Sequence, residues 1–259
     1  MKLLGVVTFI AFASFAQAQT PVEKAWTMLS DATQDKSYET RGKAIQSLAV
    51  ISGDARAQSA AEAALKDEHE EVRAAAAVSL GEMRAEGSVP LLKAALKDRE
   101  TSVVFAAANA LFALGDPAAY EVYYAVLTGE KKTGDALIES QMKMLKDPKA
   151  LTKLGFEQGI GFVPFGGISL QVVKMFTTDT VTPVRAAATS KLIKDPDPKS
   201  AAALESATKD SKWLVRAAAV NAIAKRNDPS MLPAAIELLS DDSDVVRFNA
   251  AAAVIHLTR

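Results

Sequence analysis

Apolar residues recur along most of the chain at intervals of three and four positions, the spacing that places them on one face of an α-helix. Residues 232–239 and 246–254 each follow this spacing, and a short polar turn containing Asp241 separates them. Pro229 precedes the first run and fits the opening turn of a helix, where its missing N–H costs nothing. The pattern therefore predicts two helices joined by a turn.

This helix pair recurs about every 31 residues. Each of six units carries an anchor residue, and successive anchors are 32, 31, 81, 31 and 31 residues apart. An Asp stands six residues before each anchor, an Ala three residues after it, and an aliphatic residue seven after it. The anchors are Arg41, Arg73, Val104, Arg185, Arg216 and Arg247, and the preceding acids are Asp35, Asp67, Asp98, Asp179, Asp210 and Asp241. Agreement at so many phases indicates an internal repeat.

The step of 81 residues conceals one further unit. Asp135 lies one period after Val104, with Met142 seven residues later and the pair Asp147-Pro148 where other units have Asp-Pro. We interpret Asp135 as the anchor of a degenerate fourth unit, which leaves an insertion of about 19 residues in the fifth. Residues 19–259 are thus predicted to form one domain of about seven helix pairs, because a single pair cannot bury its own apolar face.

The repeat resembles the HEAT repeat family, particularly the short bacterial HEAT-like units first noted in phycobilisome lyases. The residues that carry the resemblance are Asp241, Val246, Arg247, Ala250 and Val254, and Asp67, Val72, Arg73, Ala76, Leu80 and Gly81. It implies an all-α fold, a right-handed α-α superhelical solenoid. HEAT-like proteins are mostly binding scaffolds and only occasionally enzymes.

The resemblance also implies roles for single residues. The Asp is expected to close the turn between helices, and the Arg to bond to that Asp or to the Asp of a neighbouring unit. Val104 would then leave Asp98 without its same-unit partner. The second helices of such solenoids line the concave face, which makes Asn109 and Asn221, at one shared phase, candidate partner contacts.

The first residues indicate export. Met1-Lys2 is followed by an uncharged, mostly apolar run to Phe15, and Ala16 and Ala18 suit a signal peptidase. We predict a signal peptide over residues 1–18, cleaved after Ala18, and a periplasmic or secreted protein. A membrane anchor or a first core helix is the alternative, but the run of roughly 13 residues is shorter than the ~20 needed to span a bilayer.

The amino-acid composition excludes several kinds of catalytic and metal site. The chain has no Cys and only two His, which excludes disulfides and thiolate nucleophiles and leaves little for a His-based metal centre. A HEAT-like di-iron hydroxylase site would need several His-Glu pairs, and His69-Glu70 is the only one. A net charge of -1 argues against a nucleic-acid partner. We therefore expect no catalytic residues, no metal and no cofactor.

The insertion, at about residues 155–176, departs from the repeat. Between Gly155 and Gly167 it holds five Gly and three Phe (Phe156, Phe162 and Phe165), and it has no charge from Gln158 to Val173. The three Phe are candidate partner-binding residues. Three interpretations stay open: the Phe side chains cover a mismatch left by the degenerate unit, they bind a protein partner, or they touch a membrane, since Lys residues precede them.

A ligand platform is one interpretation of each of the two Trp residues, and a packing role is the other. Trp213 is predicted to be a packing residue at a turn, and Trp26 to cover the exposed end of the stack. The leading functional hypothesis is a non-catalytic exported scaffold that binds another protein through its concave face, with or without the insertion. The alternatives are an enzyme or enzyme subunit with its site near the insertion, and a membrane-surface protein.

Overall fold

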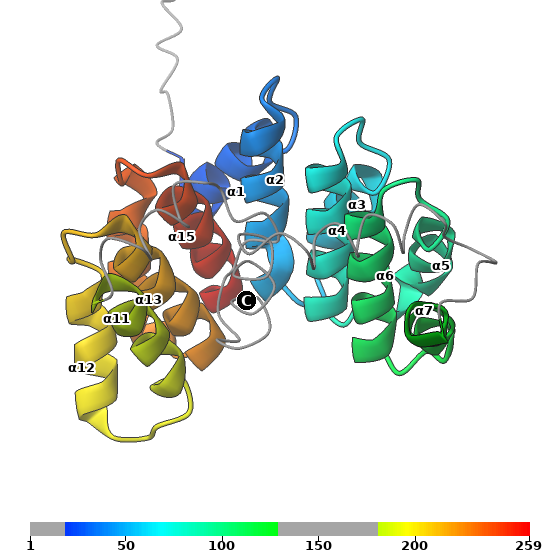
Figure 1. Cartoon of the computed structure of the whole chain (residues 1–259). Helices are drawn as coiled ribbons and strands as arrows, with labels where there is room; N and C mark the ends of the chain where they lie inside the picture. The colour runs from blue at the N-terminus through cyan, green and yellow to red at the C-terminus, as the bar shows by residue number, and fades with distance from the viewer. Residues whose placement is uncertain (1–18, 129–180) are drawn as a thin grey trace, which may run out of the picture.

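The computed structural model describes residues 19–128 and 181–259, and these form twelve α-helices and no strands. Figure 1 shows them as paired helices packed side by side, which confirms the all-α solenoid. The helices are α1 (Pro21–Ala32), α2 (Tyr38–Ser47), α3 (Ala55–Ala64), α4 (Glu70–Glu82), α5 (Val89–Ala95), α6 (Thr101–Ala113), α7 (Ala118–Thr128), α11 (Val181–Lys191), α12 (Pro198–Ala207), α13 (Trp213–Arg226), α14 (Leu232–Glu237) and α15 (Asp244–Leu257).

The repeated polar residues set the ends of these helices. The Asp of the Asp-Pro pairs caps the first helix of its unit: the Asp197 carboxylate accepts a hydrogen bond from the Lys199 N–H at 2.9 Å, and Asp228 from the Ser230 N–H at 3.0 Å. The second helix ends where a residue takes the left-handed conformation, as Gly115 does with a φ of 75°. The helices therefore begin and end at similar positions in each of these units.

The second helices form a single row whose order differs from the order of the chain. Along the row, neighbours in contact are α6, α4, α2, α15, α13 and α11 (Figure 1). The last unit thus packs against the first, and α7 and α11 lie at opposite ends of the row. The prediction that the first helix covers an end of the stack is wrong, because α1 lies in the middle.

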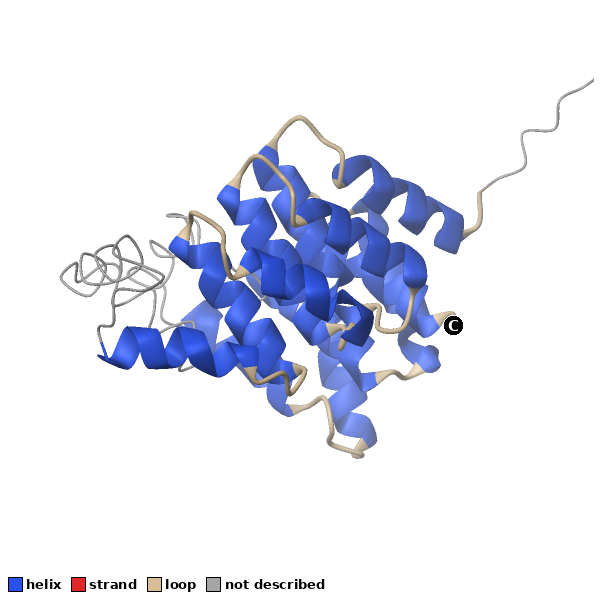
Figure 2. Cartoon of the chain, turned by 90° about the vertical axis from the view of Figure 1, so that its right-hand side faces the viewer, coloured by secondary structure: helices blue, strands red, loops and turns tan. Residues whose placement is uncertain are grey.

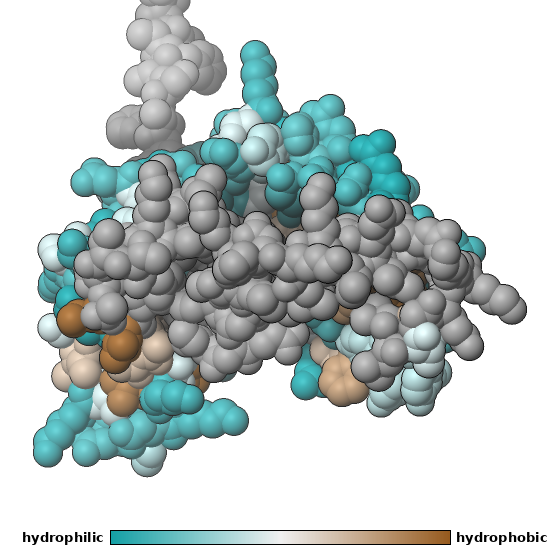
Figure 3. Space-filling view, in the orientation of Figure 1, coloured by the Kyte–Doolittle hydropathy of each residue, from teal (hydrophilic) through white to brown (hydrophobic). Residues whose placement is uncertain are grey.

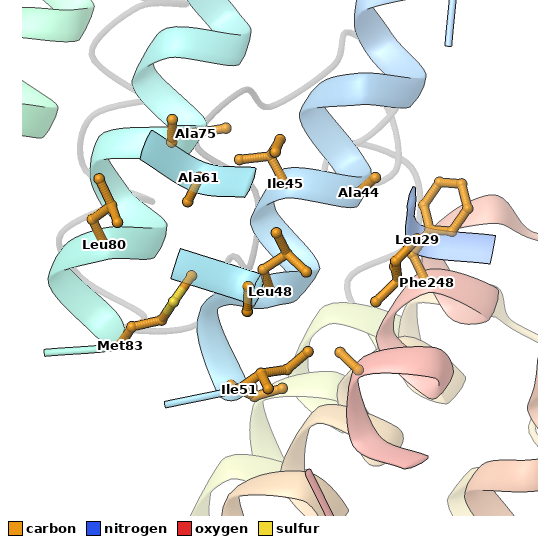
Figure 4. Packing of buried hydrophobic residues seen from close by; sticks show 14 of the residues in the cluster. Leu29, Ala44, Ile45, Leu48, Ile51, Ala61, Ala75, Leu80, Met83 and Phe248 are labelled. Atoms are coloured by element: carbon orange, nitrogen blue, oxygen red, sulfur yellow. The ribbon is translucent and has the colours of Figure 1, made fainter. Parts of the chain in front are cut away.

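The meeting of the first and last units, here called the junction, is built around α1. This helix packs more extensively on α15 than on its own partner α2. Figure 4 shows Phe248 of α15 beside Leu29 of α1 and Ala44 of α2. All three side chains are buried, and they belong to one apolar core shared by both halves of the chain.

Polar contacts also cross between the two halves. The guanidinium of Arg259 donates to the backbone carbonyls of Ser52 at 3.0 Å and Gly53 at 3.1 Å. Lys43 of α2 lies 3.8 Å from the carboxylate of Asp244 at the start of α15. These contacts surround the apolar centre of the junction.

Figure 2 shows the row from its α7 side, with helices and short loops throughout the described part. Over residues 19–128 and 181–259, every helix is too short or too polar to cross a bilayer. Trp213 is half-buried and packs against the core, as the sequence predicted.

Candidate functional site

The Asp and Arg residues that recur at fixed positions of the repeat form a repeated ion pair, here called a rung. In the rung of Arg216, Nε and Nη2 donate to the two carboxylate oxygens of Asp241 at 2.6 and 2.8 Å. Nη1 donates to the backbone carbonyl of Asp210 at 2.8 Å. The Arg therefore ties the turn of its own unit to the turn of the next, with the two-pronged geometry that suits a guanidinium and a carboxylate.

The same rung occurs at two other places, and at a third Arg185 makes a related ion pair through Nη1 and Nη2. Arg41 bonds to Asp67 at 2.7 and 2.8 Å, and Arg73 to Asp98 at 2.7 and 2.9 Å. Arg185 pairs with Asp210. The Arg was expected to bond either to the Asp of its own unit or to the Asp of a neighbouring unit. The structure shows that the side-chain ion pair joins neighbouring units, whereas only the contact with the backbone carbonyl stays within a unit. Asp98 is consequently not orphaned by Val104, because its partner comes from the preceding unit.

The environment of the rungs lowers the pKa values of their Asp residues. Burial alone would raise the pKa of Asp241, but the hydrogen bond from Arg216, the N–H of Ser243 and the nearby positive charge together hold that pKa below its ordinary value of 3.8. The pKa values of Asp67 and Asp98 are lowered by the same balance. Since each guanidinium in these rungs already has a carboxylate partner, the row of Arg is a structural feature and not an anion-binding stripe.

The junction lacks a rung. Arg247 has the phase of the other anchors, yet its guanidinium pairs with Asp244 of its own helix and donates to the carbonyl of Asp241 at 2.5 Å. Asp35, the acid that a regular stack would place next, accepts from the N–H of Ser37 at 2.8 Å, as the rung acids do from the N–H two residues after them, but Arg247 pairs with Asp244 and not with Asp35. The last and first units therefore meet without the ion pair that joins the other described neighbours.

An exposed aromatic cluster at the α7 end of the row is the candidate functional site. It consists of Asn109 and Phe112 of α6 and Tyr120, Tyr123 and Tyr124 of α7, and is called the aromatic patch below. Phe112 lies 6.0 Å from Tyr120 and 6.2 Å from Tyr123 between ring centroids, in edge-to-face contacts. Phe112 is 55% exposed and Tyr124 64% exposed.

Asn109 orders this patch. The hydroxyl of Tyr123 donates to the Oδ1 of Asn109 at 2.7 Å, which fixes α7 against α6. Burial, and then the neighbouring Tyr120, raise the pKa of Tyr123, so its hydroxyl keeps the proton that it donates. The arrangement is a rigid, uncharged aromatic surface with amide and hydroxyl groups at hand, the composition that protein interfaces favour.

The other predicted partner residues lie elsewhere. Asn221 of α13 is buried, and its Oδ1 has no hydrogen-bond partner. Asn221 occupies the same position of the repeat as Asn109. However, α13 lies between α11 and α15 in the row, whereas α6 is the last second helix at its end of the row. Phe156, Phe162 and Phe165 fall outside the described residues.

Phe112 and the three Tyr residues were missed from the sequence, although a signal was present. Eight residues after the anchor, three other units have a small buried residue, whereas the third unit has Phe112. The small residues are Ala49, Gly81 and Ala224. Three of the four Tyr of the chain also fall within residues 120–124. The fifth and seventh units have Ile there, so among these six units only the third has an aromatic residue at this phase.

Neither His forms part of a cluster. His69 stacks on Tyr38 with ring centroids 4.3 Å apart, and burial lowers the pKa of His256. In the two described ranges, no group of three or more His, Asp or Glu side chains could hold a metal ion.

Comparison with known families assigns the chain. The family model of HEAT repeats matches residues 58–133 and 171–255, so the chain belongs to the HEAT repeat family. No curated protein sequence matches it significantly.

Three solved structures are similar to the chain at low identity. Human deoxyhypusine hydroxylase in complex with glycerol is 18% identical, covers 92% of this chain and 96% of its own, with a TM-score of 0.36. The CpcE–CpcF complex of phycocyanin lyase from a Nostoc species is 19% identical, covers 97% and 100%, and has a TM-score of 0.36. A designed armadillo repeat protein is 19% identical, covers 89% and 98%, and has a TM-score of 0.27. These likenesses carry nothing about activity.

Proposed function

We propose that this protein is a non-catalytic, exported scaffold that binds another protein through the aromatic patch. The observation that carries the proposal is the exposure of Phe112, Tyr120 and Tyr124 on two helices fixed by the Tyr123–Asn109 hydrogen bond. A rigid aromatic surface loses little conformational entropy when it is covered, and Tyr is enriched among the residues that dominate interface energies.

The test is affinity capture from the exported fraction, followed by binding of the identified protein in purified form. A variant with Phe112→Ser and Tyr124→Ser removes exposed rings while the buried core stays intact. We expect its affinity for the purified partner to fall by about a hundredfold, since two hot-spot residues each contribute about 1–2 kcal/mol.

A matched control lies at the other end of the row. Val184 of α11 is 68% exposed, and Figure 3 shows hydrophobic residues at the surface on the left, on the side where Figure 1 draws α11. Val184→Ser should leave the affinity unchanged. If the control weakens binding as much as the double variant, or if neither does, the aromatic patch is not the binding surface.

Two further arms address predictions outside the described residues. Deletion of Gly159–Gly167 tests whether the insertion with Phe162 and Phe165 adds to binding: a further loss of affinity in a folded protein supports it.

Cell fractionation with N-terminal sequencing tests export. An exported chain that begins at Gln19 is expected, and an uncleaved chain retained inside the cell would contradict it.

A further inference from the structure

A cleft lies between α1 and α3, and α1 packs more extensively on α15 than on α2. The cleft has a volume of about 370 Å³, within the ~300–1,000 Å³ typical of small-molecule sites. Its residues are Trp26, Leu29, Ser30, Thr33 and Gln34 from α1 and the turn after it, Leu48, and Arg56, Ala60, Ala63, Ala64 and Asp67 from α3 and beyond.

The lining of the cleft divides into an apolar part and a polar edge. Leu29 and Leu48 are fully buried beneath it, and the small side chains of Ala60 and Ala64 leave the space open. Ser30, Thr33 and Gln34 bring hydroxyl and amide groups. An apolar cavity with a few convergent polar groups is the usual form of a site for an amphipathic small molecule.

Two charged residues border the cleft, and they differ in their partners. Asp67 is neutralised by the bidentate bonds from Arg41. The guanidinium of Arg56 stacks over the indole of Trp26, with 4.4 Å between its central carbon and the ring centroid, and the ion pairs of the described residues include none with Arg56. The cleft thus carries one positive charge without a carboxylate, held in place by an aromatic ring.

From this geometry we propose that the cleft binds a free small molecule with a flat apolar body and one carboxylate. The body lies against Trp26 and the Leu29–Leu48 floor, and the carboxylate accepts hydrogen bonds from Arg56. The guanidinium offers donors in the planar geometry that a carboxylate fits, and burial of the apolar body drives association. This site is separate from the aromatic patch and does not depend on the proposed function.

The chain supplies its own reporter, because it contains two Trp. The full-length mature chain labelled with 5-fluorotryptophan gives two fluorine resonances, one from Trp26 in the cleft and one from Trp213 outside it, and Trp213→Phe assigns them. Titration with 2-naphthoate should shift the Trp26 resonance saturably and leave that of Trp213 in place.

Two controls isolate the charge. Arg56→Gln keeps most of the side-chain stem and should weaken 2-naphthoate binding at least about tenfold, as loss of a charge-assisted hydrogen bond predicts. The neutral 2-naphthamide should bind the unchanged protein about tenfold more weakly than 2-naphthoate. An unchanged melting temperature in Arg56→Gln shows that the effect is local.

The proposal is overturned if neither resonance shifts, if both shift alike, or if Arg56→Gln binds 2-naphthoate as tightly as the unchanged protein. Ala64→Leu gives a second test that spares the charge. The larger side chain occupies the cleft and should abolish the Trp26 shift, and an undiminished shift would place the ligand elsewhere.

Discussion

The row of second helices joins its members in two different ways. Between α4 and α6, for example, the bidentate Arg73–Asp98 rung links successive turns, and Gly81 allows the two helices to approach closely. At the junction, α15 meets α1 and α2 without a rung, around the large side chain of Phe248. Regular interfaces are thus specified by the repeat, whereas the junction is specified by residues that depart from it.

The largest expected effect is at the centre of the junction. Phe248→Ala removes a buried ring between the two halves and should lower the free energy of unfolding by about 3–5 kcal/mol, measured by urea denaturation. Phe105→Ala is the matched control, since Phe105 has the same phase in the third unit but is only half-buried. Equal losses from both variants would mean that Phe248 does not hold the junction.

Next comes the rung itself. Arg216→Ala leaves the buried Asp241 carboxylate without its partner and should cost about 3 kcal/mol. Arg247→Ala removes an anchor of the same phase that forms no rung and should cost about 1 kcal/mol. The comparison fails if the melting temperatures of the two variants fall by the same amount.

A smaller effect tests the close approach of regular helices. A Cβ added at Gly81 would lie 2.8 Å from the Cα of Ala110, so Gly81→Ala should cost about 1–3 kcal/mol. At Gly42 the nearest atom would be 4.0 Å away, and Gly42→Ala should stabilise the helix by about 0.5–1 kcal/mol. Calorimetry on both variants checks the opposite signs, and a stabilising Gly81→Ala would show that α4 and α6 are not so close.

The smallest effect is the pH dependence of the rungs. Because the pKa of Asp241 is lowered in the folded state, the stabilisation is fully present above the ordinary value of 3.8 and is lost as the pH falls through the folded pKa. Unfolding free energies measured from neutral pH down to pH of about 3 should therefore fall less steeply in Arg216→Ala than in the unchanged protein. Identical pH profiles would contradict this linkage.

The sequence predicted the regular interfaces well because period and phase decide which residues face a neighbour. The helix pairs follow from residues at fixed offsets, and the resemblance to HEAT repeats implied the bonding of Arg to Asp but left open which unit supplies the Asp. Which unit is the neighbour cannot be derived in this way, since every regular unit presents the same two faces. Phe248 was a partial signal: one residue after the anchor, four other described units have Gly or Ala, but the third unit also has a Phe, Phe105.

The candidate site was predicted in part for the same reason. Asn109 was selected by its phase, and it does lie in the aromatic patch, bonded to Tyr123. Tyr120 and Tyr124 belong to α7, which lies next to the degenerate fourth unit. Their positions in the repeat therefore gave no reason to select them. The α1–α3 cleft was also beyond the sequence, because its lining comes from two units and depends on how α1 packs against its neighbours.

The central claim is that the last unit packs on the first, and a distance measures it directly. The chain has no Cys, so Ser52→Cys and Thr258→Cys give two unique, exposed sites for spin labels. In doubly labelled protein diluted with unlabelled chain, pulsed dipolar spectroscopy should give a distance below about 20 Å, since Arg259 bonds to the Ser52 carbonyl at 3.0 Å. Units stacked in chain order would separate the labels by roughly 50 Å, at 8–10 Å per neighbouring helix, and that result would contradict the junction.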